Sequence, residues 1–182
     1  MCIRDRFPVS TAVQAATVVD KIIHYSDFSD TICSDWRNNV ALLCDEGDRN
    51  YFVTNSEDID RIIASKYPVI NVNKIYFDAY PMVKIPAGNR FPEATKALND
   101  AVAKGTLIIN YIGHGGETGW SSRAVLSMAD IHAWTNSEKL PVFVTATCEF
   151  SRFDNPERFS AGEEIFVRPG GGGIAMLSLI HI

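Results

Sequence analysis

Short apolar runs alternate with amphipathic segments along this chain. The runs are rich in β-branched, aliphatic and aromatic residues and stop at glycine, proline or acidic residues, a pattern typical of buried strands in a parallel sheet. The segments between them carry apolar residues at helical spacing. The alternation predicts an α/β fold with a mainly parallel β-sheet flanked by helices, doubly wound with right-handed crossovers, and loops elsewhere. We expect strands at 40–44, 73–77, 106–112, 142–146 and 174–176, and helices at 11–27, 56–66, 91–104, 127–134 and 160–167.

Two of these strands stop at residues with reactive side chains. The run 107–112 is followed by Gly113-His114-Gly115-Gly116, and the run 141–146 is followed by Thr147-Cys148-Glu149-Phe150. Ligands of open α/β sheets sit at the carboxyl ends of the strands. If the two strands are parallel neighbours, the imidazole of His114 and the thiol of Cys148 meet at that edge. A cysteine nucleophile with a general base needs this arrangement.

The surrounding residues would complete such a site. The backbone N–H groups of Gly115 and Cys148 would form an oxyanion hole for a tetrahedral intermediate. His114 would accept the thiol proton and later protonate the leaving amine. Asp45 and Glu46 follow another predicted strand, and either could orient the imidazole as in a catalytic triad, although a solvated acidic loop is the alternative.

Two metal-based alternatives use other side chains. A metal hydrolase would use His114, Glu117 and His132, but the first two lie in a glycine-rich loop and lack the helical spacing of known ligand pairs. Asp154, Glu157 and Glu163 have the oxygen chemistry that calcium prefers, yet a solvated acidic loop is the simpler interpretation.

Composition and charge exclude several other classes of protein. The 182 residues are enough for one globular domain with its own core, and no apolar run reaches membrane-spanning length. The net charge of −5 and the scattered basic residues argue against nucleic-acid binding. Beyond Cys2, the cysteines are Cys33, Cys44 and Cys148 with no CxxC pair, which argues against a disulfide framework or a structural zinc site. Cys44 ends an apolar run and is expected to be a small buried residue.

The two ends of the chain have an unusual relationship at the DNA level. Codons for residues 177–182 can be chosen whose reverse complement contains codons for residues 1–5, as expected for a sequencing-library adapter read through at both termini. We therefore expect 7–176 to be a natural domain cut from a longer protein, and 1–6 and 177–182 to be non-native. On this interpretation the true N-terminus is missing, so the sequence says nothing about a signal peptide.

Several of these motifs resemble one enzyme family. The segment 110–120, Asn-Tyr-Ile-Gly-His-Gly-Gly-Glu-Thr-Gly-Trp, resembles the histidine motif of the gingipain-type (C25) cysteine peptidases, and 147–150 lies where that family has its nucleophile. The PorU-like sortases of the type IX secretion system are the most similar branch. The matching segments are 66–68, 75–81, 146–154, 156–158 and 160–163, and the resemblance runs from about residue 7 to residue 176.

The resemblance implies a caspase-like α/β fold and a cysteine peptidase without metal or organic cofactor. Cys148 matches the family's nucleophile and His114 its base. The family also places an acidic residue just after an earlier strand, where Glu46 matches best and Asp45 is the alternative.

The PorU-like branch implies a more specific activity. Such proteins remove the C-terminal sorting domain of secreted proteins through a cysteine thioester and transfer the new carboxyl end to an amine on anionic lipopolysaccharide. They work with other type IX secretion components at the outer membrane surface, so an outer-membrane-surface or extracellular location is implied. A general secreted gingipain-like endopeptidase and a catalytically inactive binding domain of the same fold are the alternatives.

Overall fold

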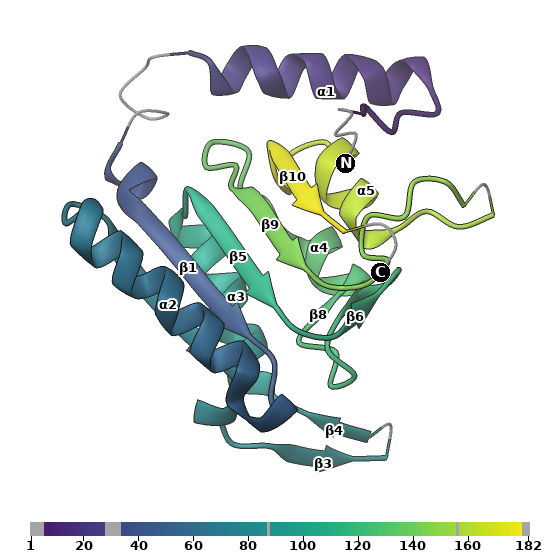
Figure 1. The fold of residues 1–182 in the computed structure, drawn as a ribbon. Coiled ribbons are helices and arrows are strands. Elements are labelled where there is room, and N and C mark those ends of the chain that lie inside the picture. Colours follow the sequence, from purple (N-terminus) through teal and green to yellow (C-terminus); the bar gives the residue numbers. More distant parts are fainter. Residues whose placement is uncertain (1–5, 28–33, 87, 156, 180–182) are drawn as a thin grey trace.

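A five-stranded parallel sheet forms the centre of the molecule (Figure 1). The structure, a computed structural model, describes residues 6–27, 34–86, 88–155 and 157–179. The strand order is β10-β9-β5-β1-β2. The chain runs from β1 to β2 on one side and then returns to β5 on the other side of β1, so the direction of winding reverses there. The strands are β1 (Asn39–Cys44), β2 (Asn71–Tyr76), β5 (Ile108–Ile112), β9 (Val142–Ala146) and β10 (Ala175–Ser178).

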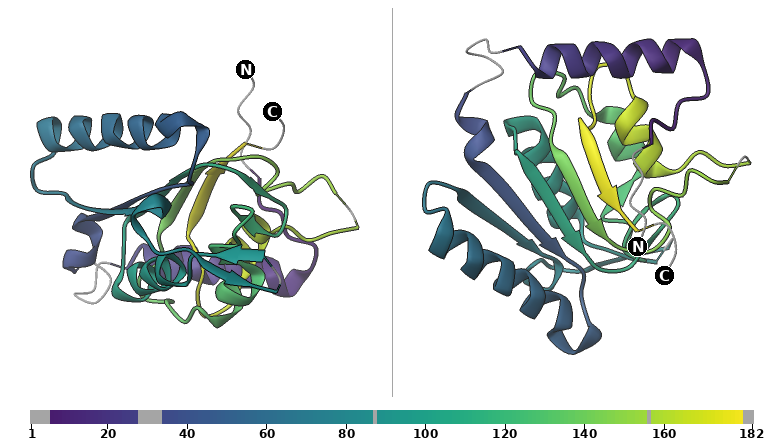
Figure 2. Two further views of the ribbon diagram at one scale, coloured as in Figure 1. Left: turned by 90° about the horizontal axis from the view of Figure 1, so that it is seen from below. Right: turned by 45° about the horizontal axis from the view of Figure 1, so that its top comes forward.

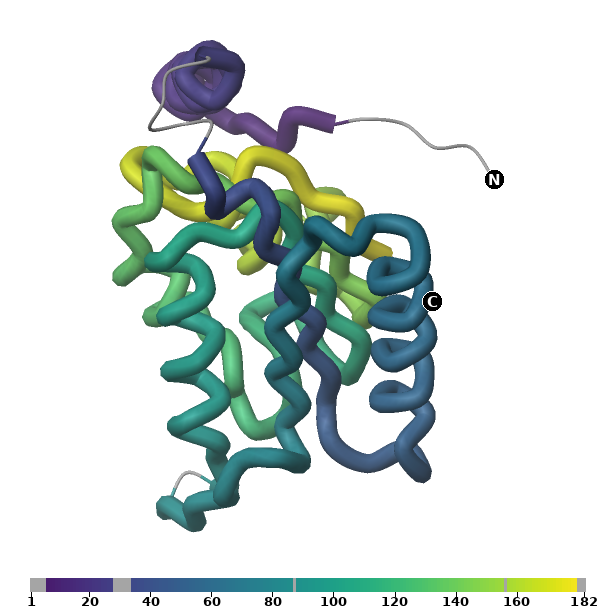
Figure 3. The backbone as a smooth tube through the Cα atoms, turned by 90° about the vertical axis from the view of Figure 1, so that its left-hand side faces the viewer, coloured from purple at the N-terminus to yellow at the C-terminus, as the bar shows by residue number. Residues whose placement is uncertain are grey.

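Helices cover both faces of this sheet (Figures 2 and 3). Helix α2 packs on one face, where it contacts β1 and β5, and α3, α4 and α5 lie on the other. Helix α1 crosses the amino ends of the strands and contacts α5 (Figure 1). The helices are α1 (Ala12–Tyr25), α2 (Tyr51–Lys66), α3 (Pro92–Lys104), α4 (Met128–Ala133) and α5 (Ala161–Val167), with short 3₁₀ turns η1 (Asp35–Asn38), η2 (Asp48–Asn50) and η3 (Phe77–Ala79). The expected α/β fold is therefore confirmed.

The main core lies between the sheet and helices α3, α4 and α5. The side chains of Leu43, Ile109 and Phe143 point to this side and are fully buried against helix residues such as Leu98 and Ile165. β1 is buried on both faces, which explains its nearly continuous apolar run, whereas β5 and β9 alternate between buried and partly exposed residues. None of the described helices is long and apolar enough to cross a bilayer.

Local signals set most of the helix boundaries. Ser127 and Ser160 each form a capping box with the acidic residue three positions later, which starts α4 and α5 as predicted. Gly105 ends α3 with a φ of 99°, which glycine tolerates best. The predicted start of α2 at residue 56 is wrong: Ser56 is buried within the helix, which begins at Tyr51 after a left-handed Asn50.

Two further small sheets replace expected loops. A hairpin joins β3 (Val83–Ile85) to β4 (Gly88–Arg90), and a three-stranded antiparallel sheet contains β6 (Gly115–Gly116), β7 (Gly119–Trp120) and β8 (Leu126–Ser127). Strands of two or three residues contain no apolar run, so the hydrophobic pattern could not predict them. The second of these sheets begins directly after His114 and shapes the site described next.

Helix α1 is attached to the rest of the molecule through its side chains. The Lys21 ammonium donates to the carbonyl oxygens of Phe166 and Gly171, 2.9 and 3.0 Å away, near the end of α5. These are carbonyls at and just beyond a helix C-terminus, which an ammonium group satisfies well. His24 on the same helix is partly exposed and lies 3.0 Å from Glu138.

Candidate active site

The register of two neighbouring strands places His114 and Cys148 at the same level of the sheet. In the β5–β9 pair the last partners are Ile112 and Ala146, and the N–H of Gly113 donates to the carbonyl oxygen of Ala146, 3.3 Å away. His114 and Cys148 are each the second residue beyond that last pair. Both side chains are exposed at the carboxyl edge. The sheet thus holds an imidazole and a thiol on adjacent loops that leave it side by side.

The two loops remain in contact beyond the strands. A methyl group on Gly115 would come 2.5 Å from Oγ1 of the buried Thr147, so only glycine allows this approach. On the other side of the thiol, Glu149 has a φ of 53°, in the left-handed region that non-glycine residues seldom occupy. A sharp turn at Glu149 therefore directs the chain away immediately after Cys148. Strained backbone of this kind gathers at functional sites.

Asp45 holds the backbone of the histidine loop. Its carboxylate is 3% exposed and accepts hydrogen bonds from the Ser121 hydroxyl at 2.8 Å and from the backbone N–H groups of Glu46 at 2.9 Å and His114 at 3.3 Å. The Tyr111 hydroxyl is a more distant donor at 3.4 Å. The contact with His114 is to its main-chain N–H. Asp45 is thus placed to fix the loop that carries the imidazole, and its bonds leave the ring itself to other partners.

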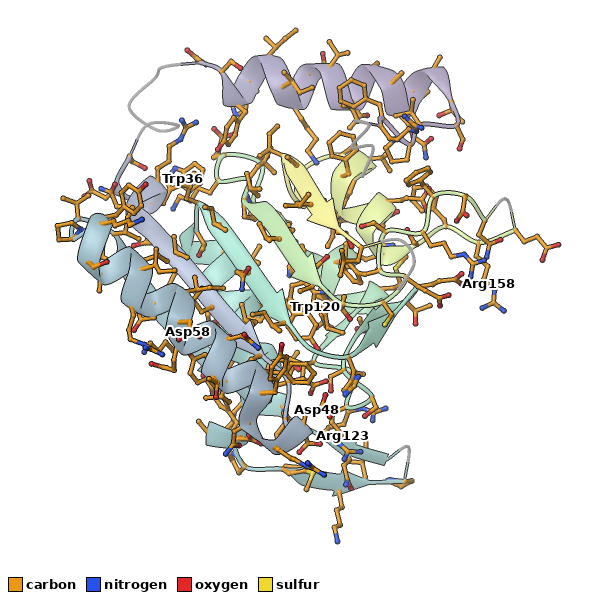
Figure 4. All side chains as sticks on the ribbon, in the orientation of Figure 1. Trp36, Asp48, Asp58, Trp120, Arg123 and Arg158 are labelled. Carbon is orange, nitrogen blue, oxygen red and sulfur yellow. The ribbon has the colours of Figure 1, made fainter. Side chains whose placement is uncertain are left out.

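The carboxylate beside the imidazole belongs to Asp48. Its Oδ2 lies 3.5 Å from Nε2 of His114. Glu46, the residue expected to orient the ring, instead lies 2.6 Å from Nε of Arg123. Figure 4 shows Asp48 and Arg123 beyond the carboxyl ends of the strands, whereas Trp36 marks the opposite end. In this structure the Glu46 carboxylate pairs with the guanidinium of Arg123, so the assignment of Glu46 or Asp45 as the orienting residue stays a prediction.

An unusual turn brings Asp48 to this position. Gly47, Asp48, Arg49 and Asn50 all have positive φ values, from 44° to 85°. Four successive left-handed residues reverse the chain between β1 and α2. The sequence carries a signal of such a turn in its Gly, Asp and Asn residues, which tolerate this region best. Sequence reasoning identified the acidic segment but considered only its first two members.

Aromatic side chains from β5, β7, α2 and the cysteine loop pack around the histidine loop. The Tyr111 hydroxyl donates to the carbonyl oxygen of His114 at 2.6 Å. The Tyr111 ring stacks on Trp120 with centroids 4.4 Å apart, and Trp120 in turn lies 5.3 Å from Phe150 in the cysteine loop. The edge of Phe52, from α2, packs against the imidazole at 5.4 Å. One aromatic cluster thus connects both loops.

The strand ends carry concentrated negative charge. Burial raises the pKa of Asp78, and the nearby Glu46 and Asp45 carboxylates raise it further. Burial together with Asp45 also raises the pKa of Tyr111 well above its ordinary value. Tyr111 therefore keeps its proton and serves as a hydrogen-bond donor at any physiological pH.

The side chains proposed for metal binding are engaged elsewhere. Glu117 lies within 3.5 Å of Arg152 and Arg158 and accepts from the Asn155 amide at 3.1 Å, while His132 is 3.3 Å from Glu164. Across the described residues, no group of three or more His, Cys, Asp or Glu side chains is arranged to hold a metal ion. The three residues of the metal-hydrolase alternative are thus not brought together as a ligand set among the described residues.

The acidic loop considered for calcium has other roles. Glu163 accepts from the backbone and side chain of Ser160 at 2.8 Å, as the capping residue of α5. Asp154 lies 3.4 Å from Arg152, which also contacts Glu117 and Glu149. Arg152 therefore links the histidine loop to the cysteine loop through ion pairs.

Cys44 is buried, whereas Cys148 is exposed. Cys44 is fully buried in β1, and burial raises the pKa of its thiol to about 12, with a smaller contribution from the nearby carboxylates of Asp78 and Asp45. The thiolate is the reactive form, so Cys44 is inert in the folded protein. Cys33 lies outside the described residues.

Comparison with known proteins identifies the family. The model of peptidase family C25 matches residues 5–181. The chain belongs to peptidase family C25. A search of curated protein sequences found no match.

Solved structures show the same fold. The chain is similar to the Arg-specific cysteine proteinase gingipain R (RgpB), with a TM-score of 0.72 and 20% identity over 92% of this chain and 37% of that chain. The complex of Porphyromonas gingivalis RgpB pro- and mature domains gives 0.72 and 20% over 93% and 38%. A third structure, described only as a protease, gives 0.68 and 19% over 93% and 34%. The C25 domain therefore has the caspase-like fold of gingipain, and it spans little more than a third of those chains.

Proposed function

We propose that this C25 domain is a cysteine peptidase that works by acyl transfer, with Cys148 as nucleophile and His114 as general base. The observation that carries the proposal is the common register of the two residues. Each is the second residue past the Ile112–Ala146 pair on adjacent parallel strands, and each is exposed. This arrangement of a thiol and an imidazole on neighbouring strands supports the proposed proton exchange between them.

The reaction then has two balanced steps. The Cys148 sulfur bonds to the scissile carbonyl carbon while its proton passes to the imidazole, and the C–N bond breaks as His114 gives that proton to the leaving amine. Water or a second amine then attacks the thioester, the C–S bond breaks, and the proton returns to the thiol. The backbone N–H groups of Gly115 and Cys148 stabilise the oxyanion in both steps. The Nε2 atom faces Asp48, so Nδ1 serves the thiol.

The finer proposal is a sortase of the type IX secretion system. It rests on the resemblance of segments such as 146–154 and 75–81 to the PorU-like branch. The substrates are secreted proteins with C-terminal sorting domains, and the acceptor is an amine on anionic lipopolysaccharide. Other type IX components are the partners, at the outer membrane surface or outside the cell. Family membership alone equally accommodates a secreted endopeptidase that uses water as acceptor.

Selective labelling of the thiol tests the peptidase proposal. We would treat the domain with a library of peptidyl chloromethyl ketones and map the adducts by mass spectrometry, beside His114→Ala and Cys148→Ala variants. The expected result is labelling at Cys148 that falls at least a hundred-fold in His114→Ala and persists in the presence of a chelator. Cys44 provides an internal control, since its burial keeps it unlabelled until the protein unfolds.

Two outcomes would contradict the proposal. Equal slow labelling of Cys148 with and without His114 would show that the imidazole does not activate the thiol, and the domain would be a binding module of the peptidase fold. If a chelator abolishes peptide cleavage while the Cys148 thiol stays unmodified, a metal enzyme would be favoured.

Analysis of the cleavage product identifies which acceptor resolves the thioester. A protein that carries a C-terminal sorting domain would be incubated with the enzyme and an amine-bearing anionic lipopolysaccharide, and the new C-terminus would be analysed by mass spectrometry. An amide-linked product supports the sortase proposal. A free carboxylate as sole product, at saturating amine, would favour the endopeptidase.

A further inference from the structure

A groove of about 530 Å³ opens beside His114, and the proposed reaction leaves it without an occupant. It lies between the three-stranded sheet β6-β7-β8 and the start of α4. We call it the hairpin groove. Its volume falls in the range of pockets that bind small ligands or a few peptide residues. The residues that matter for the argument are His114, Gly116, Thr118, Leu126, Met128 and Ala129.

The position of the hairpin groove relative to the two reacting groups decides which part of a substrate it can hold. His114 and Gly115 form one end of its wall, whereas Cys148 does not line it. The sulfur bonds to the acyl carbon, so residues before the scissile bond lie on the sulfur side. The imidazole protonates the leaving amine, so the residue after the scissile bond lies on the imidazole side. The hairpin groove is on the imidazole side.

The chemistry of the wall indicates the kind of residue that fits. Apart from the imidazole, the groove is lined by glycine, alanine, serine, threonine, leucine and methionine, with no carboxylate, ammonium or guanidinium group. Burying a charged side chain there would leave it unpaired at considerable cost. The methionine at 128 adapts to apolar groups of different shapes.

We propose that the hairpin groove is the binding site for the first residue of the leaving segment, and that it selects uncharged, apolar side chains there. The inference rests on the proposed peptidase function and names its specificity on the side of the leaving group. By microscopic reversibility, an amine that resolves the thioester enters through the same groove. An uncharged acceptor amine is therefore favoured over one with a carboxylate near its nitrogen.

Variants on one helix can test this directly. Ala129 is exposed at the start of α4 and lines the groove, and Ala133 is exposed at the end of the same helix and does not. A phenylalanine at each position gives a matched pair. Gly116→Leu supplies a second variant from the opposite wall, because a side chain on Gly116 meets nothing within 4 Å and its φ is not left-handed.

The substrates would be peptide libraries randomised before the scissile bond, with Gly, Leu, Phe, Asp or Lys fixed directly after it. For the unsubstituted domain we expect kcat/KM to be about 10-fold or more higher with Leu or Phe than with Asp or Lys. Ala129→Phe and Gly116→Leu should lower cleavage before Leu and Phe about 10-fold and leave cleavage before Gly within 2-fold. Ala133→Phe should change neither.

A peptidyl chloromethyl ketone separates this inference from the proposed function, because it occupies only the acyl side. Unchanged Cys148 labelling in Ala129→Phe, together with the altered preference, supports the groove assignment. If Cys148 labelling in Ala129→Phe falls as much as cleavage does, the groove holds the acyl segment and the inference is wrong. The inference is also wrong if the unsubstituted domain shows no preference among the five libraries. Failure of the unsubstituted domain to label at Cys148 would instead remove the proposed function, and the inference with it.

Discussion

The Oδ2 atom of Asp48 lies 3.5 Å from Nε2 of His114, on a turn whose residues all have left-handed backbone. A carboxylate at this distance favours one ring orientation, and in the proposed reaction it would stabilise the imidazolium that forms when the thiol gives up its proton. We expect Asp48→Asn to lower the labelling rate of Cys148 about 10-fold, and Glu46→Gln to lower it less than 2-fold, since Glu46 is bound to Arg123.

Labelling rates and urea unfolding of both variants would check this expectation. The Asp48–His114 pair is more than half-exposed, so Asp48→Asn should alter the free energy of unfolding by no more than about 0.5 kcal/mol. The reverse order of effects, with Glu46→Gln the slower enzyme, would restore Glu46 as the orienting residue.

Removal of the Tyr111 hydroxyl should loosen the histidine loop without disturbing the aromatic stack. Tyr111→Phe keeps the contact with Trp120 but loses the 2.6 Å hydrogen bond to the His114 carbonyl. We expect the free energy of unfolding to fall by about 1–2 kcal/mol and Cys148 labelling to slow. Tyr76→Phe is the control, because its hydroxyl donates to Glu57 on α2 and not to the histidine loop. Both variants should lose stability in urea, and only Tyr111→Phe should label more slowly.

Gly162 ties helix α5 to the cysteine loop. Its N–H donates to the Phe150 carbonyl at 2.9 Å, and a methyl group there would overlap Ser151 Oγ and approach that carbonyl to 2.8 Å. Gly162→Ala should therefore displace the loop, costing about 1–3 kcal/mol and most of the Cys148 reactivity. Gly116→Ala, in open space, should leave both quantities nearly unchanged. Full labelling in a destabilised Gly162→Ala protein would show that the loop is less coupled to α5 than the packing indicates.

Cys44 should make the protein less stable in alkali. Burial raises its pKa from about 9 to about 12 in the fold. Above pH 9 the unfolded state therefore loses this proton while the folded state keeps it, and the free energy of unfolding falls as pH rises toward 12. At pH 10 the loss from this group relative to pH 8 is about 1.4 kcal/mol. In urea unfolding at pH 8 and pH 10, the free energy of unfolding of Cys44→Ala should fall by this amount less than that of the unsubstituted protein. The same pH dependence in both proteins would show that Cys44 does not cause the loss.

The large elements of this fold were predictable because buried strands and helices require a regular spacing of apolar residues in the sequence. The strands that carry Leu43, Ile109 and Phe143 are rich in buried apolar residues, and serine caps and the Gly105 stop mark several helix ends. The same runs placed His114 and Cys148 at strand ends, because a residue that follows a buried strand has only one edge of the sheet at which to emerge.

The surroundings of the imidazole were less predictable for a different reason. Arg123 and Glu46 are 77 positions apart in sequence, and no local pattern indicates that they meet. The approach of Asp48 depends on four left-handed residues whose direction only the folded chain reveals. The strands β6, β7 and β8 are too short for any hydrophobic period, so the groove beside His114 was beyond reach of sequence reasoning.

The parallel topology also determines when the carboxyl edge of the sheet can form during folding. Each strand of the sheet pairs in parallel, so every pairing must wait for an intervening crossover, and the Asp45–His114 contact closes a loop of 69 positions. Contacts so distant along the chain form slowly. During synthesis Cys148 is made 34 residues after His114, and the two can come together only once β9 has paired with β5. The proposed peptidase activity therefore requires the β5–β9 pairing and cannot arise before it.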